Sequence, residues 1–570
     1  MMKKSQFYFQ AMCLIGAVAF VSACSENTLV DENVTESKTL TSISATMPTD
    51  ATSRVTFTDG NTQMSQVWKT GDQIYINANQ AAIATGNQFT LAQGAGSASG
   101  ATFTGSFSYA GASYLYAYYP VSSNWTIGAK SGTMAFNFAN QDGTLNGLTN
   151  FAVMAAVATP SAQPSFQFHN MTALMKFKFT FPTDVESAAE YNFTQAQMYN
   201  NGKPAYDSGA SHVILWYPQD VNTYGGITVT LPSGSTTITN NQSTVYFAMP
   251  AGWYNSVYNQ GSTKNLIIKV PVGDDYYAGI INKDQLLEPG KMYTVNKSLV
   301  AAKYANAEAT TFTDNNKGDF WLIDNANANC LAAVTSALNA LKTANSSRKI
   351  TLVLPSYTNT DVPTQFAQGC TNLEKVYIPA ATGDIPYKTF EGCTSLKTFS
   401  APYATSVGAT GTSSNVFYGC TALTNVDIPN VTTIGTNAFD GCSALASINL
   451  PKVTSIGGNA FAGCSALTEI NLPMLQTITG GEVFNNCTNL TKITLGGGTD
   501  WGKFTGINTA NLTSLFNGLG NTSCSLYLPE GQKVSADKKW TVVLNDGSDQ
   551  TQTIIVSVFA HVYVGGIQKF

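Results

Sequence analysis

The feature that most constrains the fold is a repeat with one cysteine in every copy. Six cysteines recur at intervals of 23, 27, 22, 22 and 23 residues. They are Cys370, Cys393, Cys420, Cys442, Cys464 and Cys487. Each has a leucine three residues after it and a phenylalanine three or four residues before it. A fixed period in the low twenties predicts a solenoid, in which each unit buries its apolar edge only by stacking on its neighbours.

One copy shows how a unit of this solenoid is built. After Cys442 the apolar residues are Leu445, Ile448 and Leu450, and Pro451 follows. Ile448 and Leu450 are two residues apart, so they lie on one face of a short strand. Proline ends that strand because it has no N–H to give to the ladder. The Ala-Phe pair before each Gly-Cys supplies the rest of the inward-facing side chains.

The recurring series Ile-Gly, Ala-Phe, Gly-Cys and Leu-x-x-Ile-x-Leu-Pro resembles the BspA-type leucine-rich repeats of bacterial surface proteins. The match runs from about Ile350 to Leu495. It implies a leucine-rich-repeat solenoid, which we place at residues 350–530 with one irregular last unit. The copy between the second and third cysteines is longer, with an interval of 27 residues against 22. We expect its extra residues to form a loop at Ala409–Asn415.

The repeat cysteines admit two interpretations. Neighbouring strands lie about 4.8 Å apart, which is within the reach of a disulfide, and an exported protein can oxidise its thiols. Yet this position calls for a small buried apolar side chain, and free cysteine is among the most buried residue types. We favour a reduced, buried ladder with a structural role. A zinc site is disfavoured, because the sequence has no CxxC pair and no histidine near the repeats.

The N-terminus carries an export signal. Lys3 and Lys4 precede the apolar run AMCLIGAVAF, which ends in Val-Ser-Ala-Cys at Cys24. The run is too short to span a bilayer and is typical of a signal peptide, which we place at residues 1–23. Its end resembles a bacterial lipoprotein box, which implies that Cys24 is lipidated and becomes the mature N-terminus. The alternative is an ordinary signal peptide that happens to end in cysteine.

Residues 24–41 are polar and acidic and are expected to form a flexible tether. Acidic residues soon after the lipidated cysteine resemble the surface-export signals of Bacteroides-type lipoproteins. We therefore expect a protein anchored by its N-terminal lipid in the outer membrane and exposed at the cell surface.

Composition and motifs argue against an enzyme and against a nucleic-acid partner. Charged residues make up 11% of the chain and the net charge is −5, so there is no basic footprint for nucleic acid. The three histidines, His169, His212 and His561, are far apart in the sequence. No HExxH, GxSxG or P-loop motif is present. We expect no catalytic site, no cofactor and no metal.

Between residues 42 and 300 short alternating runs, such as QIYIN, LMKFKFTF and STVYFAMP, are broken by Gly, Asn, Pro and Ser. Such runs predict strands, and their number and spacing predict β-sandwiches, which we place at residues 42–160 and 161–300. SRVTFTDG with VWKTGDQIYI, the tyrosine strand ending at Pro120, FQFHNMTALMKFKF and LEPGKMYTVNKSL resemble fimbrillin-like proteins of the same bacteria. The resemblance implies a mostly β chain with two tandem transthyretin-like sandwiches, and a role as pilus subunit or adhesin.

Two features of this half have alternative interpretations. Tyr114, Tyr116 and Tyr118 alternate on one strand face and form either an aromatic platform for sugar or, as we favour, part of a packed core. Arg54 follows the tether and precedes the predicted strand Val-Thr-Phe. Fimbrillin precursors are matured by cleavage after an arginine, which frees a groove for a neighbour's strand. The resemblance makes Arg54 a candidate processing site; the alternative is an exposed arginine at a strand start.

The segments that flank the repeats are expected to close them. We assign residues 301–349 to a linker and a helical cap, since a solenoid needs its first unit covered. Four leucine and valine residues recur there at helical spacing: Leu331, Val334, Leu338 and Leu341. Residues 531–570 are assigned to a C-terminal β cap, with one long alternating strand from Ile554 to Val564. The alternative is a strand donated to another subunit.

The order of anchor, sandwiches and repeats predicts a surface-anchored adhesion lipoprotein whose solenoid binds a host or bacterial surface protein or glycan. The outward positions of the repeats are Ser, Thr, Asn, Ala and Glu, with no aromatic or charged stripe to select a partner. One alternative is a fimbrial tip or accessory pilus subunit, which would bind other fimbrial subunits. Another is a glycan-capture lipoprotein of an uptake system.

Overall fold

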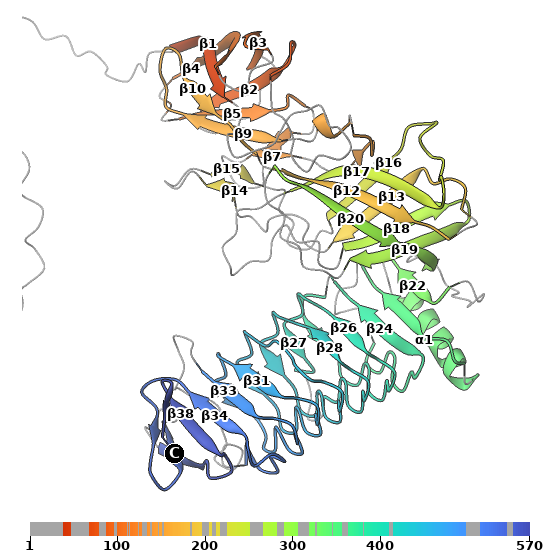
Figure 1. The fold of residues 1–570 in the computed structure, drawn as a ribbon, viewed down its shortest axis with the longest axis vertical. Helices are drawn as coiled ribbons and strands as arrows, with labels where there is room; N and C mark the ends of the chain where they lie inside the picture. Colours follow the sequence, from red (N-terminus) through yellow and green to blue (C-terminus); the bar gives the residue numbers. More distant parts are fainter. Residues whose placement is uncertain are drawn as a thin grey trace, which may run out of the picture.

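The chain is built almost entirely of strands. The computed structural model describes residues 38–46, 68–78, 87–95, 100–110, 112, 114–122, 125–127, 134–136, 140–145, 147–150, 153–170, 172–182, 185–195, 204–207, 213–216, 225–250, 266–281, 290–305, 318–324, 328–344, 346–355, 363–379, 381–409, 414–496, 514–543 and 551–569. Within these ranges there is one α-helix, α1 (Ala328–Thr343), and one short 3-10 helix, η1 (Gly147–Asn150). Figure 1 shows two strand-rich units followed by a long solenoid.

The N-terminal unit is one eight-stranded sheet in the order β10-β1-β4-β3-β2-β5-β9-β11. Its strands are β1 (Lys38–Thr46), β2 (Gln73–Ala78), β3 (Gln88–Gln93), β4 (Ala101–Tyr109), β5 (Leu115–Tyr119), β9 (Met154–Ala158), β10 (Ser165–Gln167) and β11 (His169–Asn170). β10 pairs with β1 at one edge and β11 pairs with β9 at the other, so adjacent residues close the sheet on itself. Buried Trp68 lies at the centre, edge-on to Phe103, Tyr119 and Phe168.

The second unit has two packed layers. In one layer β12 (Thr172–Thr180) lies between β17 (Gln242–Pro250) and β20 (Met292–Ser298). The facing layer holds β8 (Asn140–Gln141), β16 (Gly225–Thr230), β13 (Glu190–Gln195), β18 (Leu266–Val272) and β19 (Asp275–Ile281). Between them Phe177 packs on Phe179, Phe193 and Phe247, with ring centroids 5.4, 5.2 and 5.3 Å away. Two further hairpins are β6 (Trp125–Ile127) with β7 (Met134–Phe136), and β14 (Pro204–Asp207) with β15 (Val213–Trp216). β15 contacts β7 and also β9 of the first unit.

The two N-terminal units do not divide where the sequence placed the boundary. The division between residues 160 and 161 is wrong, because β10 and β11 still belong to the first sheet. Conversely, β8 belongs to the second unit, where the side-chain amide of Gln141 donates to the carbonyl of Ala248 and accepts from its N–H, at 2.9 and 2.8 Å. The predicted tether 24–41 is also too long, since β1 already begins at Lys38.

A single sheet runs from the second unit into the solenoid, so the predicted linker at 301–349 is wrong. Its further strands are β21 (Val300–Ala305), β22 (Phe320–Ile323), β23 (Ile350–Val353), β24 (Leu373–Tyr377), β26 (Thr398–Ser400) and β28 (Asn425–Asp427). β21 pairs antiparallel with β19 and parallel with β22. Every later strand is parallel to the one before it, which makes one eleven-stranded sheet.

The helix expected before the repeats is α1, and it forms part of the first turn of the solenoid. It connects the parallel neighbours β22 and β23 and buries Cys330 with the four predicted residues of its apolar face in the repeat core. α1 therefore packs on the first unit, at the N-terminal end of the solenoid core, where a cap was expected. The edge of the solenoid sheet is covered separately by β21, whose other edge is already paired.

One continuous core fills the solenoid from Ala305 to Val564. Opposite the large sheet, a second wall is formed by short parallel strands: β25 (Asp384–Ile385), β27 (Ser406–Val407), β29 (Thr433–Ile434), β30 (Ser455–Ile456) and β32 (Thr477–Ile478). The repeat phenylalanines stack between the walls at 5.6, 5.2, 5.3, 6.2 and 6.5 Å. They are Phe390, Phe417, Phe439, Phe461, Phe484 and Phe516.

The long copy keeps its register around the inserted residues. Val407 pairs with Ile434, 27 residues on, whereas the N–H of Phe417 bonds the carbonyl of Ala438, only 21 residues on. The extra residues therefore lie between Gly408 and Phe417, as predicted. Asp384 of the previous unit holds the start of the insertion, since its carboxylate accepts from the N–H of Ala409 at 2.9 Å.

The C-terminal segment closes the solenoid, but not with one long strand. The alternating run breaks into β37 (Thr551–Ile555) and β38 (His561–Val564), separated by a turn. β38 adds a parallel strand to the last sheet, formed by β31 (Glu469–Leu472), β33 (Lys492–Leu495), β34 (Ser525–Leu528), β38 and β39 (Ile567–Gln568). β35 (Lys533–Val534), β36 (Lys539–Val543) and β37 form a small antiparallel sheet. Because β38 stacks on β34, the solenoid extends past the predicted end at residue 530.

The repeat cysteines form a ladder of buried free thiols. Each thiol from the second copy onward donates to a backbone carbonyl of the preceding unit. The acceptors of Cys393, Cys420, Cys442, Cys464 and Cys487 are the carbonyls of Ala367, Phe390, Phe417, Phe439 and Phe461, at 3.0 to 3.3 Å. Each of these carbonyls also accepts a backbone N–H from its own unit. The carbonyl of Phe417, for example, accepts from the N–H of Cys420 at 3.0 Å. The sulfur thus joins neighbouring units while it fills the core.

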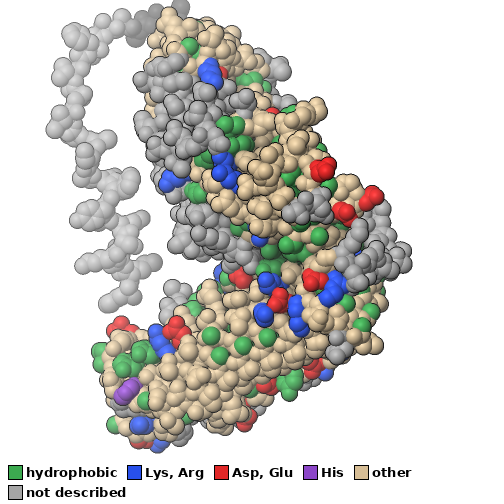
Figure 2. All heavy atoms as spheres, turned by 45° about the vertical axis from the view of Figure 1, so that its right-hand side comes forward, with side chains coloured by type: hydrophobic (Ala, Val, Ile, Leu, Met, Phe, Trp, Pro, Cys, Tyr) green, Lys and Arg blue, Asp and Glu red, His purple; other side chains and the backbone are tan. Residues whose placement is uncertain are grey.

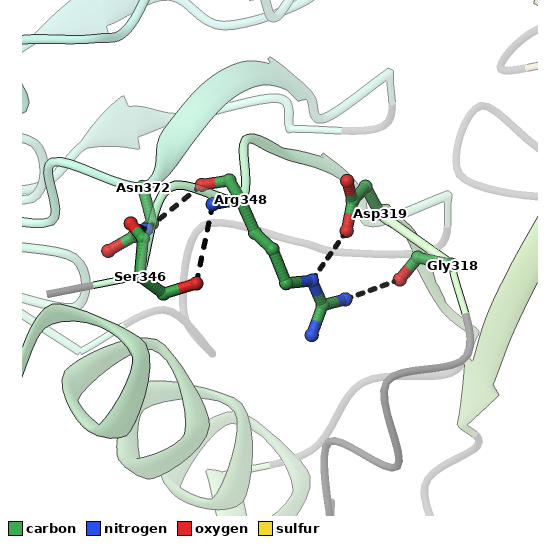
Figure 3. Close-up of polar contacts among 5 residues, drawn as sticks. All are labelled: Gly318, Asp319, Ser346, Arg348 and Asn372. Atoms are coloured by element: carbon green, nitrogen blue, oxygen red, sulfur yellow. Dashed lines mark hydrogen bonds and ion pairs between the residues drawn. The ribbon is translucent and has the colours of Figure 1, made fainter. Parts of the chain in front are cut away.

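An arginine ties the start of the fused sheet to the first repeat (Figure 3). Arg348 donates through Nε to Oδ1 of Asp319 at 2.7 Å and through Nη2 to the carbonyl of Gly318 at 2.8 Å. Beside it, the amide of Asn372 donates to the carbonyls of Ser346 and Arg348, at 2.6 and 2.9 Å. These bonds connect the residues before β22, β23 and β24, where the sheet changes from sandwich to solenoid.

We expect Arg348→Ala to lower the free energy of unfolding by about 1–2 kcal/mol, because two donors are lost and the Gly318 carbonyl loses its partner. Arg348→Lys should recover only part of this, since an ammonium cannot serve both acceptors with the geometry of a guanidinium. Urea unfolding followed by tryptophan fluorescence measures both, as Trp321 is fully buried in the adjacent strand. An unchanged midpoint for Arg348→Ala would show that the hydrogen bonds of Arg348 to Asp319 and Gly318 do not stabilise the fold.

The ladder thiols should be unreactive in the folded protein. Burial raises the pKa of Cys370 to about 11 and the pKa values of Cys420 and Cys487 to about 12, so at pH 8 each is a protonated thiol. A chain from Ser25 to Phe570 should show no fast reaction with a thiol reagent when native and eight reactive thiols in denaturant. An exposed control, Ser447→Cys, should react at once. Fewer than eight thiols after unfolding would indicate a disulfide.

Candidate functional site

The lipidation candidate Cys24 and the processing candidate Arg54 lie outside the described residues, as does His212. His169 is in β11 of the first unit and His561 is in β38 at the end of the solenoid. Across the described ranges, no three His, Cys, Asp or Glu side chains are grouped so that they could hold a metal ion. No helix in the same ranges is long and apolar enough to cross a membrane.

The tyrosine strand of the first unit packs a core. Tyr118 is fully buried and Tyr116 is 6% exposed, and both join the apolar cluster of the second unit. Burial raises the pKa of the Tyr118 phenol far above its usual range. Partly buried Tyr114 packs against the same cluster. The side chains of β5 therefore join the two N-terminal units, as the favoured interpretation held.

The outward face of the solenoid sheet offers a large open surface with a regular layout. Successive strands are in register, so equivalent side chains line up in columns across the units. One column near the centre contains Ser400, Asp427 and Asn449, and a parallel column contains Thr398, Asn425 and Ser447. The residues between the columns, such as buried Phe399, point into the core. The centre of this face therefore presents hydroxyl, amide and carboxylate groups.

The sheet is interrupted at this centre. The eleven-stranded sheet ends at β28 and the last sheet begins at β31. Among the described residues, no backbone hydrogen bond joins Ser447–Asn449 to β28 or to β31. The opposite wall stays paired across the same units, and Phe417, Phe439 and Phe461 remain stacked. The units therefore separate only on the outward face.

A groove of about 360 Å³ lies at the interruption. Its lining comes from three successive units: Thr398–Ser400, Thr424–Asp427 and Ser447–Asn449. Ser400 Oγ donates to Oδ2 of Asp427 at 2.9 Å, which fixes the one carboxylate of the groove. Asn449 and Ser447 are exposed. The groove is shallow, its surface is about equally polar and apolar, and Asp427 is its only formally charged residue.

Charged side chains gather away from the groove. Figure 2 shows red and blue side chains clustered where the solenoid meets the second unit, while most of the solenoid face in view is uncharged. Lys269 pairs with Asp324 at 3.4 Å, and Lys397 with Glu374 at 2.8 Å. The hydrogen bond from Lys397 lowers the pKa of the Glu374 carboxyl. These four charged side chains at the junction therefore form ion pairs with one another.

The sequence analysis missed an aromatic stack on the outward face. Tyr527 of β34 and Tyr563 of β38 lie parallel, with ring centroids 4.5 Å apart, and Lys492 lies over Tyr527 at 5.3 Å. Both tyrosines follow the last regular repeat, where the spacing no longer shows which strands are neighbours. The expectation of an outward face without an aromatic stripe is wrong at this end. Because the lysine and the second ring cover Tyr527, its faces are not open to a ligand.

Comparison with solved structures gives low overall similarity. A proposed cell adhesion protein from Bacteroides ovatus is 14% identical, with a TM-score of 0.27, over 46% of this chain and 95% of that one. A fimbrial protein from Bacteroides ovatus is 12% identical, with a TM-score of 0.20, over 45% of this chain and 50% of that one. The T. pallidum leucine-rich repeat protein is 17% identical, with a TM-score of 0.20, over 40% of this chain and 72% of that one.

No curated protein matches the chain. The model of the BspA-type leucine-rich repeat region matches with six copies, over residues 344–408, 360–491 and 410–518. These ranges contain the cysteine ladder and the stacked phenylalanines described above. Residues 344–518 are therefore similar to BspA-type leucine-rich repeat regions.

Proposed function

We propose that this chain is a lipid-anchored, surface-exposed adhesion protein without enzymatic activity, whose solenoid binds a protein or glycan on host or bacterial cells. The observation that carries the proposal is the continuous sheet from β19 through β21 into the repeats. It joins the recognition solenoid to the second unit by backbone pairing. A solenoid supported in this way presents a large, fixed surface.

The arrangement of the ends supports the same proposal. β1, the first described strand, lies in the unit farthest from the end of the solenoid in Figure 1. A lipid on Cys24 would therefore attach at the opposite end from the last repeats. Several acyl chains on one cysteine hold a protein firmly to a membrane. The repeats would then face away from the anchored end.

Cells that display the full chain should attach to host or bacterial target cells, and an excess of the soluble chain from Ser25 should compete. Cys24→Ala should abolish attachment and move the protein from the outer-membrane fraction to the medium, because the lipid anchor is lost. Ser25→Ala, next to the lipidation site, is the matched control and should leave both properties unchanged. Attachment by Cys24→Ala cells, or none by wild-type cells, would contradict the proposal.

A second candidate function is that of a fimbrial subunit, favoured by the position of β1. This strand precedes Arg54 and lies inside the first sheet, antiparallel to β4 and parallel to β10. Its side chains Leu40, Ile43 and Ala45 are buried. Cleavage after Arg54 would remove β1 and leave two open strand edges with an apolar slot, which a strand of a neighbouring subunit could fill.

This candidate predicts a mature N-terminus at Val55 and SDS-resistant ladders in unboiled cell extracts. Arg54→Ala should abolish both, because the cleavage site is lost, while Lys69→Ala, a nearby exposed cation, should change neither. N-terminal mass spectrometry of surface material gives the answer. Finding only acylated Cys24, with a strictly monomeric protein, would leave the adhesion proposal alone in place.

A further inference from the structure

The interruption in the solenoid sheet is the most unusual feature of its outward face. Elsewhere on this face strands pair with their neighbours in register, from β21 to β28 and from β31 to β38. At Ser447–Asn449 that pairing is absent among the described residues, and the groove of about 360 Å³ opens there. Small-molecule sites begin at about 300 Å³, so the groove is large enough to hold part of a ligand.

The lining selects the chemistry of that ligand. Six side chains border the groove in two columns: Ser400, Asp427 and Asn449, and Thr398, Asn425 and Ser447. Ser400 is only 2% exposed and supports Asp427, while the other five reach the surface. Together they offer hydroxyl and amide groups that both donate and accept, and one carboxylate that accepts. A polyhydroxyl ligand, whose groups also do both, can pair with each of them. Within the described residues, the side chains of Ser447 and Asn449 make no hydrogen bond of their own.

The same lining disfavours other ligand classes. Protein-binding hot spots are built on Trp, Tyr and Arg, and none of these lines the groove. Anionic glycans need cations, but the lining holds no Lys or Arg and its single charge is the carboxylate of Asp427. On the preceding strands, Lys397 donates to Glu374 at 2.8 Å. Lys375, the partner of Thr398 in β24, lies one strand before the groove and outside its lining. An uncharged, hydroxyl-rich ligand remains.

We propose that the groove between β28 and Ser447–Asn449 is a binding site for an uncharged oligosaccharide. Asp427, held by Ser400, accepts from sugar hydroxyls, and the amides of Asn425 and Asn449 bridge neighbouring hydroxyls on either side. This assignment rests on the proposed adhesion function and gives its solenoid a ligand class. Because the site is shallow, each copy binds weakly.

Titration of the soluble chain with uncharged tri- and tetrasaccharides, followed by saturation-transfer NMR, tests the site. Sialylated and sulfated versions of the same sugars serve as competitors. Asp427→Ala and Asn449→Ala should each weaken binding by about tenfold, the effect of losing one hydrogen bond to a charged or well-placed polar group. Asn471→Ala is the matched control, since this exposed asparagine occupies the equivalent position one unit farther along, outside the groove.

Asp427→Asn guards against a folding defect, because it keeps the shape of the side chain and removes the charge; it should weaken binding with an unchanged unfolding midpoint. Tighter binding of the acidic sugars, no binding of any uncharged sugar, or an equal loss in Asn471→Ala would overturn the site. Cell attachment separates the two proposals. If displaying cells attach and Asp427→Ala binds sugar normally, the groove assignment fails while adhesion stands. If the soluble chain binds sugar but the cells do not attach, adhesion fails and the groove stands.

Discussion

The two pairings of β21 determine how the rest of the molecule is arranged. On one side it is antiparallel to β19, in the manner of a sandwich, and on the other it is parallel to β22, in the manner of a repeat. Because register is preserved across both pairs, Tyr276, Ala302 and Phe320 share one face of the sheet. The other face is covered first by the layer of β12 and then by the solenoid core. An open sheet edge is a site of unwanted association, and here the last edge of one unit is the first pairing partner of the next.

The cysteine ladder shows why a thiol suits a stacked unit. Packing requires a small side chain, and alanine would satisfy that requirement. The thiol adds a weak donor aimed at a carbonyl such as that of Phe417, which already accepts one N–H from its own unit and has a second lone pair to fill. Serine would donate more strongly, but its hydroxyl costs more to bury than a thiol does. Cysteine therefore provides a bond between units without introducing a strongly polar group into the core.

The sequence predicted the repeat units well because their signal is local and recurs. The inward side chains, the strand after each repeat leucine other than Leu445 and the loop between Gly408 and Phe417 all follow from spacing within one or two copies; the strand predicted at Ile448–Leu450 does not form. The junction could not be predicted in the same way. β21 and β22 are paired by contacts between segments that carry no repeat, and the alternation in Phe320–Ile323 does not show which strand lies beside it. The break near Val556 was missed because apolar alternation continues through the turn, although Phe559 must leave the strand to pack edge-on to Phe516.

The interruption at Ser447–Asn449 was also beyond the sequence, since this copy is one of the most regular in the chain. Its inward residues Leu445, Ile448 and Leu450 are buried as in other units, so the core gives no sign that the backbone has lost its lateral bonds. A solenoid can tolerate this loss on one wall because the opposite wall and the aromatic stack still join the units. A shallow site of this kind binds weakly one copy at a time. Display of many copies on one surface raises the total affinity only if each site is held in a fixed orientation. The backbone-paired junction at β21 provides that fixed orientation. The same sheet that covers the edge of the solenoid therefore also allows many weak grooves to add up to a higher total affinity.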